Sequence, residues 1–187
     1  MTKIPLKGLN IFLAILIAFN FVLGTVVFVL NKNQLFIYLL KCNMSSFLYY
    51  IIVALNGIAV CALIFVNFHN KLIIALSVVL LVLGLGFTFL LFTFFTASYD
   101  AKYFEFKSDS KTIIVEKWSW LLAGGSNVYQ KVNPFIMVYL DGYIGTDDGY
   151  RPFSNNDYNI EWEESAVIIT YGFGNPGVEH TERFALK

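Results

Sequence analysis

The sequence predicts a membrane protein with three transmembrane helices followed by a small C-terminal all-β antiparallel domain. Three long stretches without a charged residue fill the first half of the chain, and no aspartate or glutamate precedes Asp100. After that point the apolar pattern changes to the short alternating runs that are typical of strands. We place the boundary near residue 96, with a helical region at 1–96 and a β domain at 97–187.

The composition supports this division and excludes one class of function. Of the 187 residues, 57% are hydrophobic and only 14% are charged, whereas charged residues make up about a quarter of an average soluble domain. The formal net charge is zero because the lysines of a basic first half balance an acidic second half. Neither half carries the clustered basic residues that nucleic-acid binding requires.

Three uncharged segments, 11–30, 47–68 and 72–95, are each long enough to cross a bilayer as a helix. About 20 apolar residues are needed for one crossing. A helix in the core of a soluble protein would show a polar face, and none of the three segments has one. The first segment is longer than the core of a signal peptide, so we expect it to remain uncleaved.

The two connections between these spans differ in length. Residues 67–71 form a short turn, so the second and third spans are expected to be an antiparallel hairpin. The connection at residues 31–46 is longer, and its LFIYLL core is expected to lie in the membrane interface or to prolong a helix. Asn20 and Asn56, which are polar residues inside the spans, are candidates for hydrogen bonds between helices.

The lysines near the spans favour a cytoplasmic N-terminus. Three fall on each side of the membrane: Lys3, Lys7 and Lys71 on one, Lys32, Lys41 and Lys102 on the other. The free amino group adds a positive charge to the N-terminal side, and positive charge is retained in the cytoplasm. Since the chain crosses three times, the β domain is expected on the extracytoplasmic side of the cell membrane.

The C-terminal part contains about six short runs with strand character, separated by turn residues. KYFEFK alternates between two faces, and TIIVEKWSWLL returns after a turn at 108–110. Residues 123–127 are predicted as a loop, and Asp141-Gly142, between apolar runs, predicts a hairpin turn. Further strands at 158–162 and 166–173 flank another turn, and ERFAL forms an edge strand. A compact antiparallel sheet follows from this pattern.

No catalytic, cofactor-binding or metal-binding motif is found in the sequence, and no cofactor is expected. Ser126 and His180 are the residues that a membrane-tethered hydrolase would use, but the G-x-S-x-G frame is missing. The aspartates and asparagines of 141–157 fit turn chemistry, and they lack the spacing of an EF-hand. Whether this stretch binds calcium is left open by the sequence.

By elimination, the sequence favours binding as the function, in an accessory, sensor or immunity-type protein that contacts another membrane or cell-surface protein. Trp118 and Trp120, at strand spacing, are candidate partner contacts, although their pattern favours a place in a core or at a membrane interface. Tyr150 and Arg151 are the other two candidates. The alternative is a subunit of a membrane transport complex, since the spans contain no ionisable acid or base for independent ion transport.

The end of the chain, from Thr146 onward, is a turn-rich stretch followed by strands. A D-Y-x-I-x-W turn and strand, formed here by Asp157, Tyr158, Ile160 and Trp162, precedes an alternating strand. This arrangement is similar to the ending of uncharacterised small membrane proteins and lipoproteins of low-GC Gram-positive bacteria. The resemblance implies a bacterial cell-surface setting and no known activity.

Overall fold

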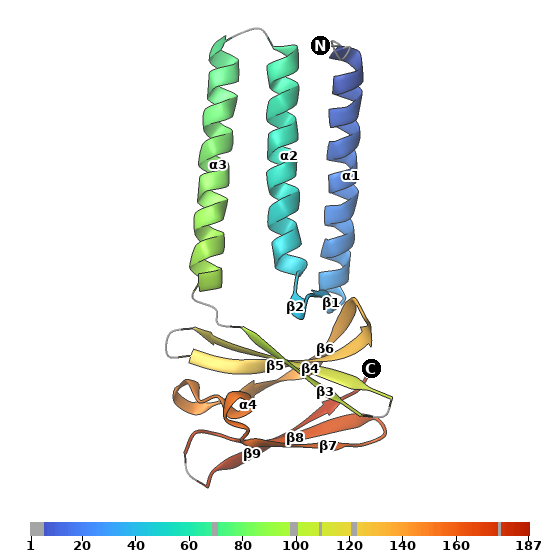
Figure 1. Cartoon of the computed structure of the whole chain (residues 1–187), viewed down its shortest axis with the longest axis vertical. Helices are drawn as coiled ribbons and strands as arrows, with labels where there is room; N and C mark the ends of the chain where they lie inside the picture. The colour runs from blue at the N-terminus through green and yellow to red at the C-terminus, as the bar shows by residue number, and fades with distance from the viewer. Residues whose placement is uncertain (1–5, 69–70, 98–100, 109, 121–122, 176) are drawn as a thin grey trace. The chain divides into compact units, whose positions relative to one another are not determined.

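The computed structural model describes residues 6–68, 71–97, 101–108, 110–120, 123–175 and 177–187. The chain divides into two compact units. The first comprises Met1–Asn33 and Ser45–Phe92, and the second comprises Gln34–Met44 and Thr93–Lys187. Long helices make up the first unit, and antiparallel strands make up most of the second (Figure 1).

The first unit consists of three helices, α1 (Leu6–Lys32), α2 (Ser45–Asn67) and α3 (Lys71–Ala97). All three are long and apolar enough to cross a membrane. Their surfaces are also apolar, with Phe21 on α1 72% exposed and Leu72 on α3 77% exposed. Extended apolar surface of this kind is stable against lipid, whereas soluble proteins keep exposed apolar patches small.

The side chains that are buried on α1 and α2 recur at every seventh residue. They are Leu13, Asn20 and Val27 on α1, and Ser45, Ile52 and Ala59 on α2. This spacing keeps them on one side of each helix, as in helices that pack along their length. Gly24 of α1 faces α2, because a Cβ at this position would lie in ordinary van der Waals contact, 3.6 Å, with Cγ2 of Ile52.

The second unit contains a six-stranded and a three-stranded antiparallel sheet (Figure 1). The larger sheet has the order β2-β1-β6-β5-β4-β3, and the smaller has the order β7-β8-β9. The larger comprises β1 (Leu35–Leu39), β2 (Cys42–Asn43), β3 (Lys102–Lys107), β4 (Thr112–Trp120), β5 (Ala123–Asn133) and β6 (Ile136–Gly145). The smaller comprises β7 (Tyr158–Trp162), β8 (Ala166–Gly172) and β9 (Glu179–Ala185).

The main hydrophobic core of this unit includes side chains from both sheets. It contains Ile113, Val115, Val128, Leu140 and Ile144 of the larger sheet, and Val167, Ile169, Tyr171 and Phe184 of the smaller. Phe153, from the short helix α4 (Pro152–Asn155), completes it and is 1% exposed. The alternation that predicts strands in the sequence thus places one side of each sheet in a common interior.

The segment between α1 and α2 belongs to the β domain, which the sequence did not predict. Strand β1 pairs with β6, for example Leu35 with Val138, and β2 pairs with β1. The LFIYLL run therefore does not prolong a helix, because its first five residues are strand β1, and its position in the membrane interface stays a prediction. Its alternating β-branched and aromatic residues suit a strand, and β6 supplies the partner from a part of the sequence about 100 residues away.

The larger sheet is strongly curled, because its distant strands meet through side chains. The hydroxyl of Tyr38 on β1 donates a 2.9 Å hydrogen bond to Glu105 on β3. Four strand spacings separate β1 from β3 in the order of the sheet, which would be about 19 Å if the sheet were flat. The concave face of the curl buries a second cluster, formed by Tyr38, Ile114, Tyr129 and Met137.

Two predicted turns are also corrected. Residues 123–127 form the first half of β5, paired with β4 up to Trp120 opposite Ala123. Strand β6 continues through Asp141 and Gly142, where the register with β5 shifts. Leu140 and Ile144 on either side are both fully buried in the core, and a tight hairpin would remove one of them. Gly142 is required there because its φ is +143° and a side chain would meet the Phe184 ring.

Candidate binding site

Tyr150 and Arg151 lie between the 3₁₀ helix η1 (Asp147–Gly149) and α4, in the connection from the larger sheet to the smaller. Both residues line a surface depression of about 330 Å³. A second depression of about 320 Å³ shares Tyr150, Gly174 and Asn175 with the first. Tyr150 therefore stands between two neighbouring hollows.

The side chain of Tyr150 is held in place by its own domain. Its hydroxyl donates a 2.7 Å hydrogen bond to Oδ2 of Asp157. This bond to a carboxylate raises the pKa of Tyr150 above its ordinary value, because ionisation would place two negative oxygens together. The backbone N–H of Tyr150 donates to Asp147, and the hydroxyl of Thr146 donates to the Tyr150 carbonyl oxygen, both at 2.8 Å. Less conformational freedom is then lost when a partner binds.

Two glycines, Gly172 at the end of β8 and Gly174 in the loop after it, make room for this arrangement. A side chain at Gly172 would collide with the carboxylate of Asp157. Gly174 has a φ of +122°, and a Cβ there would lie 3.1 Å from Cβ of Tyr150. Glycine is the residue that tolerates both this backbone conformation and this close approach.

The lining of both depressions is polar; the first carries both signs of charge, and the charged side chains of the second are all acidic. Asp147, Arg151, Asn155 and Asn175 line the first depression, and Asp157 and Glu179 line the second. Arg151 is exposed, and its Nη2 lies 3.5 Å from Oγ of Ser119. Pockets for small molecules are mostly apolar. Amides, carboxylates and a guanidinium around a fixed tyrosine instead suit the polar surface of a partner, where Tyr and Arg often dominate binding.

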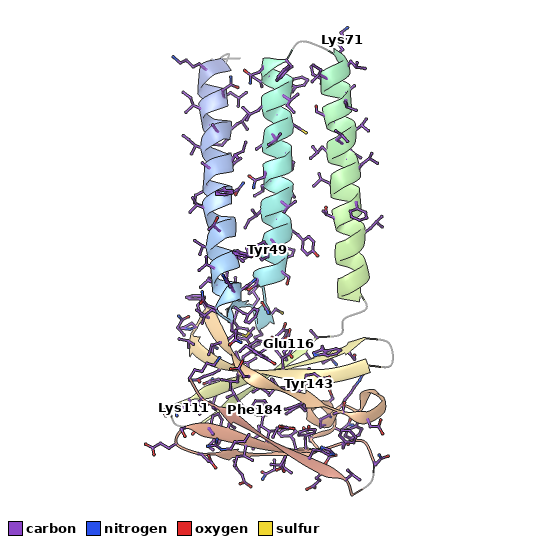
Figure 2. All side chains as sticks on the ribbon, turned by 180° about the vertical axis from the view of Figure 1, so that it is seen from behind. Tyr49, Lys71, Lys111, Glu116, Tyr143 and Phe184 are labelled. Carbon is purple, nitrogen blue, oxygen red and sulfur yellow. The ribbon has the colours of Figure 1, made fainter. Side chains whose placement is uncertain are left out.

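The structure does not bring Trp118 together with Tyr150 and Arg151. Trp118 is adjacent to Ser119 on β4, so the two side chains leave the strand on opposite faces. The Trp118 ring lies 6.1 Å from the ring of Tyr143, which is labelled in Figure 2. The hydroxyl of Tyr143 donates to the carbonyl oxygen of Gly124 at 2.9 Å. The side chain of Trp120, the fourth candidate, lies outside the described residues.

A buried carboxylate that sequence analysis missed lies on the same face as Trp118. Glu116 is 4% exposed and accepts hydrogen bonds from Tyr103 at 2.5 Å, Tyr129 at 2.7 Å and Asn127 at 3.1 Å (Figure 2). These three donors offset the cost of removing the carboxylate from water. The sequence signals only that Glu116 shares a strand face with the apolar Ile114. It does not indicate which side chains would donate hydrogen bonds to the carboxylate.

A second carboxylate, Glu105, ties β1 into the curled sheet. Its Oε1 accepts hydrogen bonds from the hydroxyl of Tyr38 at 2.9 Å and from Nζ of Lys131 at 3.2 Å. Burial alone would raise the pKa of Glu105, but the two hydrogen bonds and the charge of Lys131 lower it overall. Burial and the bond to Glu105 raise the pKa of Tyr38. The cluster joins the segment between α1 and α2 to β3 and β5.

This arrangement predicts an acid-sensitive contribution to stability. The folded-state pKa of Glu105 lies below its ordinary value of 4.5, so its ionised form stabilises the fold. The contribution is complete above the ordinary pKa and is lost as the pH falls through that value and then through the lower folded-state pKa. Below about pH 5, the midpoint temperature of thermal unfolding should change less with pH in the Glu105→Gln variant than in the unchanged protein. The exposed Glu161→Gln is the control, and an equal effect of both substitutions would contradict the prediction.

The residues of the hydrolase alternative are not joined in the structure. Ser126 is 2% exposed within β5, whereas the exposed His180 on β9 stacks on Phe173 with ring centroids 4.2 Å apart. No hydrogen bond links Ser126 to His180 among the described residues. Over the same residues, no three side chains of His, Cys, Asp or Glu are grouped as metal ligands would be.

Polar side chains within the helical unit are of two kinds. Asn10 and Asn67 form a reciprocal amide pair at 2.9 and 3.0 Å, which joins the start of α1 to the end of α2. Nδ2 of Asn20 and Oδ1 of Asn56 are buried without a hydrogen-bond partner in the described structure. Nδ2 of Asn20 is a donor and Oδ1 of Asn56 is an acceptor, so each could take part in a hydrogen bond. Because neither atom has a partner here, the interhelical hydrogen bonds that the sequence predicts for the two asparagines stay a prediction.

Comparison of the chain with protein-family models, with curated proteins and with solved structures gives no match in any of the three. Any assignment of function therefore rests on the residues and their geometry.

Proposed function

We propose that this chain is an integral, multi-pass protein of the cell membrane whose β domain binds another membrane or cell-surface protein. It would act as an accessory subunit, a sensor or an immunity-type protein. The observation that carries the proposal is the pair of polar depressions on either side of Tyr150. A fixed tyrosine, an exposed arginine and surrounding amides offer specific hydrogen bonds to the polar surface of a partner.

The connectivity of the chain supports a single water-exposed side for the β domain. The segment between α1 and α2 and the chain after α3 both enter the same unit, so the ends of α1 and α3 face one side. Three successive crossings place the end of α1, the start of α2 and the end of α3 on the same side of the membrane. With the N-terminus in the cytoplasm, as the lysines favour, the β domain is extracytoplasmic.

Site-specific photo-crosslinking in native cells tests the proposed binding site. A photoreactive phenylalanine derivative at Arg151, which lines the first depression, should yield a discrete crosslinked partner in the membrane fraction. The same probe at Glu161, an exposed residue of β7, is the control. No adduct at Arg151, or the same set of adducts at both positions, would contradict binding at this site.

A second variant separates the site from the rest of the domain. Tyr150→Phe keeps the ring but removes the 2.7 Å hydrogen bond to Asp157. If the depressions form the binding site, this change should weaken the crosslink from Arg151 while the protein remains folded in the membrane. An undiminished crosslink would mean that the partner does not depend on the position of Tyr150.

A further inference from the structure

Two adjacent turns of the β domain expose a group of large apolar side chains. Strand β1 ends at Leu39, 42% exposed, and the turn from β1 to β2 carries Leu40, 82% exposed. The end of β5 carries Val132, 58% exposed, and the turn from β5 to β6 carries Phe135, 60% exposed. We name these four residues the turn patch. The backbone N–H of Tyr38 donates to the carbonyl oxygen of Phe135 at 2.8 Å, so the turns lie side by side.

The first of these turns has an unusual sequence for its conformation. Leu39 pairs with Cys42, which leaves Leu40 and Lys41 as a two-residue turn with φ values of 54° and 59°. Such turns favour Asn-Gly, because other residues are strained at positive φ. The left-handed conformation costs roughly 1–2 kcal/mol per residue. The chain thus places a large apolar residue at a position where neither turn chemistry nor packing within the domain favours it.

The covalent chain keeps this turn close to the membrane. Leu40 precedes Ser45, the first residue of α2, by only five residues. An extended chain spans about 3.4 Å per residue, so Leu40 stays within about 17 Å of the end of that helix. Lys32 at the end of α1 and Lys41 in the turn flank the segment, and lysines in such positions extend towards lipid headgroups.

We infer that the turn patch inserts into the headgroup region of the bilayer that α1 and α2 cross, and that the lipid surface is its occupant. Apolar side chains flanked by lysine are the usual composition of segments that lie at this boundary. The inference goes beyond the proposed function of the Tyr150 site, but it depends on insertion of the helices into a membrane. The β domain would then be attached to the bilayer by its turns as well as by its helices.

Labelling with a polarity-sensitive fluorophore tests this inference in lipid nanodiscs. Bimane is attached to Leu40→Cys or to Phe135→Cys, in full-length protein that carries Cys42→Ser and Cys61→Ser. Both labels should emit at shorter wavelength and be quenched by phospholipids that carry a nitroxide near the headgroup. A label on Val178→Cys, a 40% exposed position between β8 and β9, should show neither effect. The use of two positions guards against a local change caused by either substitution.

A third label distinguishes failure of this inference from failure of the membrane assignment. Bimane on the native Cys61 of α2, in the Cys42→Ser protein, should be quenched by a nitroxide deep in the acyl chains. If Cys61 is quenched while Leu40 and Phe135 report water as Val178 does, the turn patch does not contact lipid and the inference is overturned. If Cys61 is not quenched either, the helices are not inserted and the inference fails together with the membrane assignment.

Discussion

Replacing Glu116 with alanine should lower the free energy of unfolding of the β domain by about 3–5 kcal/mol, the sum of the costs of three lost hydrogen bonds. The substitution leaves Tyr103, Tyr129 and Asn127 without the carboxylate that accepts their hydrogen bonds. Each buried donor that loses its partner costs about 1–3 kcal/mol. The position is 4% exposed, so water has little access to replace the lost oxygens.

Tryptophan fluorescence during denaturant unfolding of the full-length protein in detergent provides the measurement. All three tryptophans, Trp118, Trp120 and Trp162, belong to the β domain, so the signal reports on that unit. Glu116→Gln, which keeps one oxygen acceptor, should lose clearly less stability than Glu116→Ala. Equal losses for the two variants would mean that packing, and not hydrogen bonding to the carboxylate, is what Glu116 contributes.

Replacing Phe184 with alanine should have an effect of similar size, about 3–5 kcal/mol, for a different reason. Phe184 on β9 is 1% exposed in the core between the two sheets (Figure 2). Its removal leaves a cavity that surrounding side chains fill only in part. The ring also contacts the position of Gly142, where β6 shifts its register, so the loss affects both sheets.

Phe135→Ala provides the matched control for this prediction. The chemical change is the same, but Phe135 is 60% exposed in the turn between β5 and β6. In detergent its loss should change the free energy of unfolding by less than about 0.5 kcal/mol. Comparable destabilisation by the two variants would contradict the placement of Phe184 in the core.

Part of the fold could be predicted from local sequence because the relevant signals are local. The uncharged runs predict the three helices, since each helix satisfies its own backbone hydrogen bonds within a continuous segment. Alternation in KYFEFK and in YNIEW predicts strands that the structure contains as β3 and β7. The seven-residue spacing of buried side chains on α1 and α2 is also present in the sequence, although apolar neighbours on all sides conceal it.

Only part of the candidate site could be predicted from the local sequence. Tyr150 and Arg151 stand out as a tyrosine and an arginine in a turn-rich stretch. Their depressions also need Gly172 and Gly174, which come from the end of β8 and the loop after it. The sequence groups Trp118 with these residues as partner contacts, but the strand directs its side chain to the other face of the sheet.

The sequence by itself determined that one half of this chain suits lipid and the other half forms strands. It did so because hydrophobicity and strand alternation are properties of consecutive residues. Only the tertiary structure decided that the segment between α1 and α2 joins the sheet, that the sheet curls until Tyr38 reaches Glu105, and that Glu116 finds three donors. The physical reason is that strand partners and hydrogen-bond partners come from distant parts of the chain, and local patterns carry no information about which distant residues will meet.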